Sequence, residues 1–279
     1  MPLYSNKIDS HFSIPLIFDS SRNNSLSNVC SLSQIVRMFV VFNNVIGKRK
    51  PAICVGKDVV LYYTDTGSQE EDSLRFLHDC EQWFGQKINI VRSKEYTNHF
   101  DVIEKKGLIS KHNYYPCTFE LKKRLRYQIE DDLKYWDGQV WGFDISETNR
   151  AQRMIEQYPN MKPLFPLIDN QPSKANCACL LAKEGIELPR MYKMGYHNNN
   201  CIGCIRGGMG YWNKIRIDFP EDFERMAKLE RVVRHSCLKE RIGNETKALF
   251  IDELSPDRGD FPTEIMPECG LFCELEFMN

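Results

Sequence analysis

Cys201 and Cys204 are separated by two residues, a spacing at which one tight turn can present two thiolates to a single metal ion. Gly203 lies inside this turn and suits the backbone conformations that tight turns require. Three further glycines follow within the stretch 207–210, where the backbone can approach a neighbouring segment closely. The stretch 198–210 is therefore a candidate metal-binding or ligand-binding turn, and one such pair is half of a tetrahedral site.

A second cysteine pair, Cys269 and Cys273, lies near the end of the sequence and could supply the other two ligands. A four-cysteine site of this kind would join two segments that are distant in the chain. The alternative is that Cys269 and Cys273 are ordinary buried thiols, as free cysteines often are. His197, four residues before Cys201, is a weaker candidate because four thiolates already complete a structural site.

The bulk composition is that of a soluble globular protein and limits the classes of function. The 279 residues include 37 Lys and Arg against 38 Asp and Glu, so no overall positive field favours nucleic acid, and such contact would need a local patch. No apolar stretch suggests a membrane span, and no secretory signal is evident. With eleven cysteines, an odd number, we expect reduced thiols or metal ligands and a cytoplasmic location.

A strand followed by a polar turn and a helix is predicted near residue 60. The apolar run 59–63 is typical of a buried parallel strand, and Asp65, Thr66 and Gly67 come directly after it. Ser68 and Glu71 have the spacing of a capping box, which predicts a helix ending near Gly85. Asp65 would thus lie at the carboxyl end of a strand, where it could bind ribose hydroxyls or a cation, or simply cap the turn.

Further alternation of strands and helices predicts an α/β fold with a doubly wound, mostly parallel sheet flanked by helices. Apolar runs at 88–91 and 140–143 read as additional strands. We divide the chain into a poorly defined N-terminal segment, 1–35, an α/β domain, 36–195, and a helical C-terminal region, 196–279. The C-terminal region would be held by its cysteines and packed on the α/β domain.

Cys117 is predicted near the start of a helix, where the positive end of the helix and the lysines that follow would favour a thiolate. The cluster 122–126, which includes Lys122, could bind phosphate. The interpretation favoured by the sequence is an exposed helical face, balanced by the acids at 130–132.

Glu147 and Arg150 have the i, i+3 spacing that places two side chains on one helical face. At the end of the strand 140–143, which contains Gly142, the carboxylate could orient the guanidinium towards an anion. An ordinary surface ion pair is the alternative.

Taken in order, these segments resemble the phosphoadenosine phosphosulfate (PAPS) reductase-like branch of the PP-loop, or adenine nucleotide alpha-hydrolase-like, superfamily. The resemblance is to members found in phage and mobile-element genomes, and it covers roughly residues 55 to 275. The matching marks are Thr64-Asp65-Thr66-Gly67, Cys117-Thr118 with Leu121-Lys122, Gly142-Phe143 with Glu147 and Arg150, Gly185-Ile186-Glu187-Leu188-Pro189, and Asn200-Cys201-Ile202-Gly203-Cys204.

The resemblance implies an adenine nucleotide, ATP or PAPS, at the carboxyl edge of the sheet. It implies that the nucleotide site is lined by Asp65, Thr66, Gly67 and Gly142. It also implies that Cys117, Lys122, Glu147 and Arg150 face the reacting end. Cys201 and Cys204 would hold zinc or a [4Fe-4S] cluster, completed by Cys269 and Cys273 or by Cys117.

One motif of the superfamily is absent from this sequence, and the sequence therefore supports two different predictions of function. The Ser-Gly-Gly-x-Asp-Ser loop of the superfamily would follow the first strand, but the chain has Asn43-Asn44-Val45-Ile46-Gly47-Lys48 there. A nest of backbone N–H groups that would cradle pyrophosphate is therefore missing from the sequence. The leading expectation is an enzyme that transfers or reduces sulfur, or adenylates a substrate. The alternative is an inactive, metal-stabilised module that binds tRNA, DNA or a protein partner such as a sulfur donor.

Overall fold

The computed structural model describes residues 38–42, 59–112, 114–134, 136, 138–143, 145–170, 178 and 181–264. The predicted N-terminal segment 1–35 and the cysteines Cys269 and Cys273 lie outside these residues. The departure at 43–48 lies outside them as well. The predictions that concern these positions therefore lie outside the described residues.

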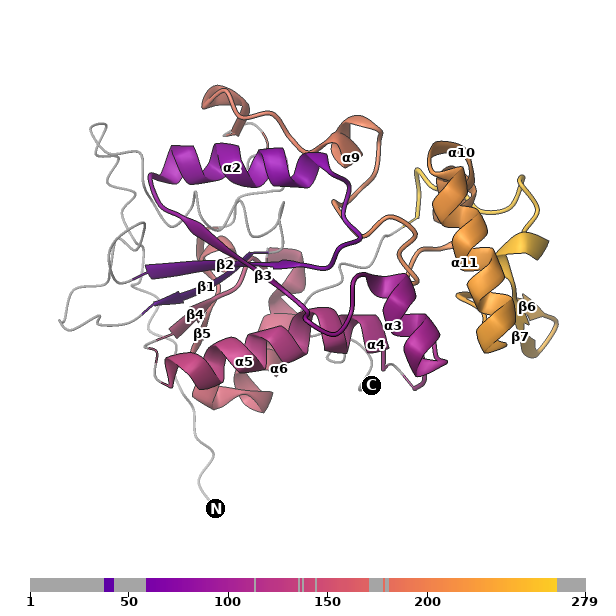
Figure 1. The fold of residues 1–279 in the computed structure, drawn as a ribbon, viewed down its shortest axis with the longest axis horizontal. Coiled ribbons are helices and arrows are strands. Elements are labelled where there is room, and N and C mark those ends of the chain that lie inside the picture. The colour runs from indigo at the N-terminus through magenta and orange to yellow at the C-terminus, as the bar shows by residue number, and fades with distance from the viewer. Residues whose placement is uncertain are drawn as a thin grey trace, which may run out of the picture.

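A five-stranded sheet with the strand order β3-β2-β1-β4-β5 forms the centre of the N-terminal half (Figure 1). Its strands are β1 (Met38–Phe42), β2 (Val59–Asp65), β3 (Ile88–Arg92), β4 (Gly138–Val140) and β5 (Pro163–Leu164). The pairs β2–β3 and β4–β5 are parallel, whereas β1 is antiparallel to both β2 and β4. Four strands thus run in one direction and the central strand runs against them.

The reversed strand decides which edge of the sheet each loop occupies. The register places Phe42, at the end of β1, opposite Val59, at the start of β2. Asp65, at the carboxyl end of β2, lies at the other edge, as does the end of the parallel-running β4. The prediction of a mixed α/β architecture with parallel strands is confirmed, but a uniformly parallel sheet is not what the structure shows.

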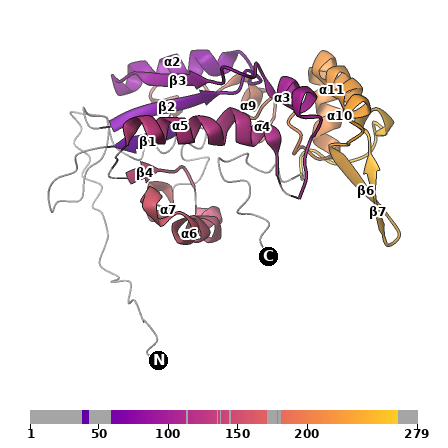
Figure 2. The same ribbon diagram turned by 60° about the horizontal axis from the view of Figure 1, so that its bottom comes forward.

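Helices cover both faces of the sheet, with α2 on one side and α5 and α6 on the other (Figures 1 and 2). The helices of this half are α2 (Asp72–Phe84), α3 (His99–Lys106), α4 (Pro116–Thr118), α5 (Arg124–Leu133), α6 (Thr148–Gln157), α7 (Pro166–Asn170) and α9 (Arg190–Lys193). A π-helical turn, η1 (Phe119–Lys123), joins α4 to α5. Short 3₁₀ turns occur at Ile145–Glu147, Pro159–Met161 and Ile251–Glu253.

The start of α2 differs from the predicted capping box. The helix begins at Asp72, its N-cap residue is Glu71, and no side chain caps it. The hydroxyl of Ser68 instead lies 2.6 Å from Nδ1 of His99 and accepts from the His99 backbone N–H, because a tertiary partner competes for it. The predicted end is confirmed, since Gly85 adopts the left-handed conformation with φ of 60°.

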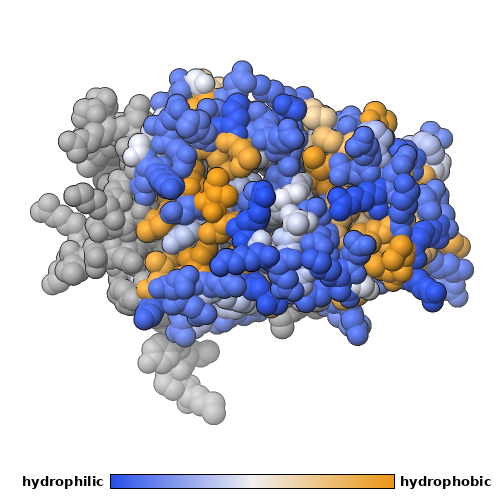
Figure 3. All heavy atoms as spheres, in the orientation of Figure 1, coloured by the Kyte–Doolittle hydropathy of each residue, from blue (hydrophilic) through white to orange (hydrophobic). Residues whose placement is uncertain are grey.

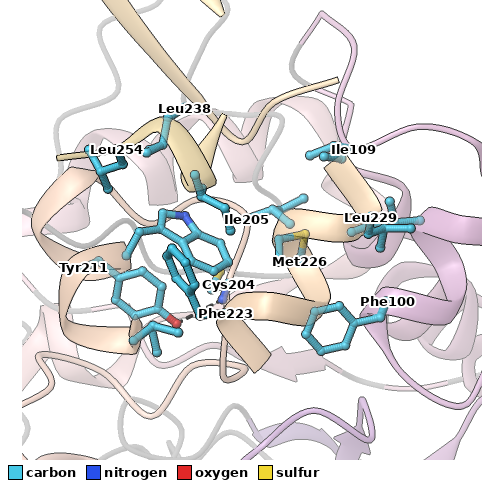
Figure 4. Packing of buried hydrophobic residues seen from close by; sticks show 14 of the residues in the cluster. Phe100, Ile109, Cys204, Ile205, Tyr211, Phe223, Met226, Leu229, Leu238 and Leu254 are labelled. Carbon is cyan, nitrogen blue, oxygen red and sulfur yellow. Dashed lines mark hydrogen bonds between the residues drawn. The ribbon is translucent and has the colours of Figure 1, made fainter. Parts of the chain in front are cut away.

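The C-terminal region contains α10 (Met209–Asp218), α11 (Pro220–Val233) and a hairpin of β6 (Leu238–Ile242) and β7 (Glu245–Leu249). It shares one hydrophobic core with α3, since Phe100 and Ile103 of that helix are buried with Trp212, Met226 and other residues of this region (Figure 4). Cys204, which ends the turn 201–204 (the cysteine turn), and the following residue Ile205 lie in the same core. The C-terminal region is therefore packed on the α/β half through α3, although the two share the core rather than meeting at a separate interface.

The surface shown in Figure 3 is mostly hydrophilic, with hydrophobic residues gathered over the sheet and over the C-terminal helices. Ile90 of β3 is 52% exposed and Val232 of α11 is 72% exposed. Within the described residues, none of the helices combines the length and the apolar character needed to cross a membrane.

The first turn of α3 is fixed by reciprocal hydrogen bonds that give a testable pH dependence. The Asn98 side chain accepts from the Asp101 N–H at 3.0 Å, and the Asp101 carboxylate accepts from the Thr97 N–H at 2.9 Å. This backbone hydrogen bond, followed by the ion pair with Lys105, lowers the pKa of Asp101 below its usual value of 3.8. The ionised carboxylate is therefore the form that stabilises the helix.

We predict that Asp101→Asn lowers the free energy of unfolding by about 1 kcal/mol at neutral pH. Because the folded-state pKa is depressed, this stabilisation is present above the unfolded pKa and disappears as the pH falls through the folded value. Urea unfolding at pH 7 and at pH 2.5 measures both points. A difference between wild type and variant that is unchanged at pH 2.5 would contradict the assignment.

Candidate functional site

The polar turn after β2 is held by its own aspartate. One carboxylate oxygen of Asp65 accepts from the Gly67 N–H at 2.7 Å, and the other forms a salt bridge with Arg92 at the end of β3. Thr66 is buried, and its hydroxyl donates to the Gln69 side chain at 2.8 Å. Both carboxylate oxygens of Asp65 therefore hold the turn itself, whereas Thr66 and Gly67 pack against other segments.

Gly67 cannot be replaced without moving a neighbouring segment. Its φ of 63° is unfavourable for other residues, and a Cβ atom would lie 1.9 Å from the carbonyl oxygen of Thr97. Gly85 has nearly the same φ, 60°, but a Cβ atom there would meet nothing within 4 Å. The glycine in the turn is thus required by close packing on the segment before α3, in addition to its backbone conformation.

The cysteine turn 201–204 is fixed by one buried tyrosine. The Tyr211 hydroxyl donates to the Cys201 carbonyl oxygen at 3.0 Å and accepts from the Cys204 N–H at 2.9 Å. Burial, together with the nearby Cys204, raises the pKa of Tyr211 well above 10, so the phenol stays protonated. The phenol O–H therefore closes the turn and braces the backbone at both Cys201 and Cys204.

The cysteine turn and the turn after β2 are in direct contact. The Cys201 sulfur lies 3.1 Å from the Thr66 hydroxyl oxygen, and the Ile202 N–H donates to the Ser68 carbonyl at 2.8 Å. The Thr66 hydroxyl has a single hydrogen, which it gives to Gln69 in this arrangement. Cys201 is then the donor to Thr66, whereas a thiolate at Cys201 would require Thr66 to turn its hydrogen towards the sulfur.

His99 joins the same two turns from the start of α3. Its ring is 2% exposed, with Nδ1 2.6 Å from the Ser68 hydroxyl and Nε2 3.1 Å from the Gly203 carbonyl oxygen. A carbonyl only accepts, so Nε2 must carry the hydrogen that forms this bond. The sequence analysis missed His99, and a single histidine within an ordinary amphipathic helix gave no signal that would have marked it.

A small cavity lies where these segments meet. It has a volume of about 20 Å³, and its lining comes from four segments. This is roughly the space of one water molecule. The lining residues are Thr66, His99, Cys117, Thr118, Leu121, Lys122, Cys201, Cys204 and Ile205. The structure thus brings together Thr66, Cys117, Lys122, Cys201 and Cys204, all of which the sequence had singled out from distant positions.

A larger cleft of about 390 Å³ opens on the Gly67–Ser68 side of the same turn. Its volume falls within the range of small-molecule sites. Arg190 and Arg225 contribute positive charge, although Arg190 is paired with Glu70 at 2.7 Å. Asp222 also lines the cleft, and burial raises the pKa of its carboxyl. The cleft is therefore mixed in charge and large enough for a nucleotide-sized ligand.

Three of the four basic residues in the cluster 122–126 are buried, so the interpretation of an exposed helical face holds only for Arg124. Lys122 and Lys123 are each 3% exposed and Arg126 is 1% exposed. They lie in and just after the π-helical turn η1, a geometry that occurs often at functional sites. The error arose because sequence spacing predicts an ordinary α-helix, and the extra residue per π-turn rotates these side chains inwards.

Glu147 and Arg150 form the expected ion pair near the end of the predicted strand 140–143. The Arg150 guanidinium is buried, binds the Glu147 carboxylate and lies 4.3 Å from the centre of the Phe143 ring. Gly142, two residues after the end of β4, is half-buried. None of Glu147, Arg150 and Gly142 is among the lining residues of the small cavity or of the larger cleft.

The described residues contain no group of three or more His, Cys, Asp or Glu side chains placed to hold a metal ion. Cys201 and Cys204 supply two thiols, and Cys269 and Cys273 fall outside the described part of the chain. His197 stacks on Phe261 with ring centres 4.6 Å apart. The Cys201 sulfur lies beside the Thr66 hydroxyl.

Glu264, which precedes Cys269 and Cys273 in the sequence, contacts the start of α10, the helix that follows the cysteine turn. The Glu264 carboxylate accepts from the backbone N–H groups of Gly210 and Tyr211, the latter at 2.9 Å. A Cβ atom on Gly208 or Gly210 would collide with this carboxylate. Cys269 follows Glu264 by five positions in the sequence, so a fully extended chain would span at most about 18 Å between them.

Comparison with known proteins gives one distant relative. The chain is 27% identical over 197 residues to an uncharacterized protein of Methanocaldococcus jannaschii, and the match covers 68% of this chain and 39% of that protein. The match therefore spans well under half of the relative's length. No family model matches the sequence, and no solved structure matches it either.

We predict that Gly67→Ala destabilises the protein by more than about 3 kcal/mol, whereas Gly85→Ala costs roughly 1 kcal/mol. Both variants carry the same cost of a positive φ, and only Gly67→Ala adds the collision with Thr97. Chemical unfolding of the two variants measures the difference. Equal losses of stability would show that the turn after β2 is not packed against the segment before α3.

Proposed function

We propose that this protein is a PAPS reductase-like enzyme that handles an adenine nucleotide at the carboxyl edge of the sheet and uses cysteine thiols in sulfur transfer or reduction. ATP-dependent adenylation of a substrate is the other reaction of this class. The observation that carries the proposal is the meeting of Cys117, Cys201, Cys204 and Lys122 around one cavity at the turn after β2. Such a group of thiols and a cation at this edge suits chemistry on an anionic sulfur-bearing substrate.

The nucleotide would occupy the 390 Å³ cleft beside Gly67 and Ser68. Because Gly67 and Ser68 belong to the turn that also carries Thr66, a ligand in this cleft would lie next to the cysteines. Asp65 would contribute indirectly by holding the turn through Gly67 and Arg92. The resemblance supports the adenine base as the ligand, and the cleft supports the size of the site.

Cys117 is the favoured nucleophile on geometric grounds. It is half-buried at the start of a helical segment, and it lines the cavity together with Lys122. The helix start favours a thiolate, and the lysine ammonium would hold an anionic group beside it. On a sulfated nucleotide, the Cys117 sulfur would form a bond to the substrate sulfur while the sulfur–oxygen bond to the nucleotide phosphate breaks. The nucleotide would then leave with the bonding electrons.

Cys201 and Cys204 fit half of a zinc or iron–sulfur site by donor type and spacing. Cys269 and Cys273 would complete it, and the anchoring of Glu264 at Gly210 and Tyr211 supports their return to this turn. A metal would supply structural cross-linking or, as a cluster, electron transfer. Tyr211 and His99 form hydrogen bonds to the backbone of Cys204 and Gly203 and also hold the cysteine turn in place.

A second candidate function, a metal-stabilised module that binds nucleic acid or a protein partner, is favoured by the direction of β1. The end of β1 lies at the edge opposite Asp65, so a loop leaving it starts away from the cleft. In the superfamily, the phosphate-binding loop follows the first strand and lies at the carboxyl edge of the sheet. The reversed strand thus agrees with the missing glycine-rich loop and disfavours the hydrolysis of ATP.

We predict that isothermal titration calorimetry shows saturable binding of ATP, adenylyl sulfate or PAPS to the purified protein. Cys117→Ala should bind nucleotide within about twofold of wild type, because the thiol reacts without contacting the base, but lose roughly 10³-fold in sulfur transfer or reduction. Cys80→Ala is the matched control, since this buried thiol on α2 does not line the cavity.

Absence of binding to all three nucleotides would overturn the enzyme proposal, and so would a fully active Cys117→Ala. Binding to tRNA or DNA that weakens steeply with salt, without nucleotide binding, would instead support the second candidate. A flat response to salt would exclude that candidate.

We further predict that protein purified without oxygen contains about one zinc or about four iron atoms per chain. The double variants Cys201→Ser/Cys204→Ser and Cys269→Ser/Cys273→Ser should each lose the metal, while Cys80→Ala keeps it. Elemental analysis gives the stoichiometry, and visible absorbance separates iron–sulfur from zinc. Full metal content in the Cys269→Ser/Cys273→Ser variant would remove the second pair from the site.

A further inference from the structure

A second cavity, of about 500 Å³, lies between the segment after α3 and the start of β6. Its described lining residues are Ser110, Lys111, His112, Tyr115, His235 and Lys239. All six carry groups that can donate hydrogen bonds, two of them are permanent cations at neutral pH, and none is a carboxylate. This cavity differs from the cleft beside Gly67, whose lining contains three carboxylates.

The positive charge in this cavity comes from two exposed lysines, Lys111 and Lys239. Neither forms an ion pair with a residue that the structure describes. Other basic residues of neighbouring elements are paired: Lys106 with Glu120 at 2.9 Å, Arg231 with Asp252 at 2.6 Å and Arg258 with Glu240 at 2.7 Å. Unpaired cations that line one cavity attract an anion.

Both walls of the cavity are held rigidly. On one side, Lys111 and Tyr114 exchange backbone hydrogen bonds of 2.9 and 2.8 Å, which close a tight turn with His112 at φ of 45°. On the other side, the buried Glu230 carboxylate accepts from the Cys237 and Ile251 N–H groups and fixes the start of β6. A non-glycine residue at positive φ is uncommon, and such residues gather at ligand sites.

His235 adds a polar atom that lacks a partner. Its Nδ1 is buried and has no hydrogen-bond partner among the described residues. A buried ring nitrogen in this state is unfavourable. We propose that this cavity binds a phosphate group, carried either by a small phosphorylated molecule or by a nucleic-acid strand, with Lys111 and Lys239 as its charged contacts.

The test is binding of pyrophosphate and of a 20-nucleotide oligothymidylate at low ionic strength, by calorimetry and fluorescence anisotropy. The double variant Lys111→Glu/Lys239→Glu should weaken binding at least tenfold. The matched control is Lys247→Glu, which lies on β7 opposite Glu240 and so faces away from Lys239. This control should stay within about twofold of wild type.

Binding of pyrophosphate that depends on the two lysines would identify a small phosphorylated ligand, and dependence seen only with the oligonucleotide would identify a nucleic-acid strand. Binding of neither probe, or equal binding by the double variant, would overturn the proposal. Hydrogen–deuterium exchange of the wild type provides a measurement that does not require a stable variant. Ligand-induced protection should fall on 110–115 and 235–239, and protection confined to other segments would also overturn it.

Discussion

The contact on which the site depends is the imidazole of His99, placed between the Ser68 hydroxyl and the Gly203 carbonyl. Ser68 belongs to the turn after β2, and Gly203 lies within the cysteine turn, more than a hundred residues further along the chain. The ring is buried, so these bonds form without competition from bulk water and are costly to leave unmade. Through this one side chain, the sheet edge, α3 and the cysteine turn are held as a single unit.

The packing around α3 explains why a helix of only eight residues can carry this role. Its buried face supplies Phe100 and Ile103 to the core that Trp212 and Met226 occupy, while His99 faces the two turns. The Arg225 guanidinium also lies 4.4 Å from the centre of the Phe100 ring. The helix therefore belongs to both halves of the molecule, and a shift of the C-terminal region would be transmitted to the cysteines and to Thr66.

Several buried ionisable groups serve the framework rather than the chemistry. Glu120 is 1% exposed and is offset by Lys106 and Arg124. Glu230 is fully buried, and burial raises the pKa of its carboxyl although it accepts two backbone N–H groups. Such groups must be paired because an isolated buried charge is strongly unfavourable. Their positions show where the fold is least tolerant of change: at the π-helical turn and at the start of β6.

Local patterns in the sequence determined several strands, one helix end and several candidate site residues of this protein. The apolar runs 59–63 and 88–91 marked β2 and β3, whereas the run 140–143 overlaps β4 only at Val140. Gly85 marked the end of α2, and residue type and spacing singled out Cys117, Lys122, Cys201 and Cys204. These signals are readable because strand burial, helix termination and thiol spacing depend on residues close together in the chain.

The tertiary structure alone decided the rest. It set the direction of β1 and the burial of Lys122 and Lys123 in the π-helical turn. It also decided the bridging role of His99 and the gathering of Lys111 and Lys239 around one cavity. Each of these depends on contacts between residues far apart in sequence, which compete with local preferences and have no periodicity along the chain.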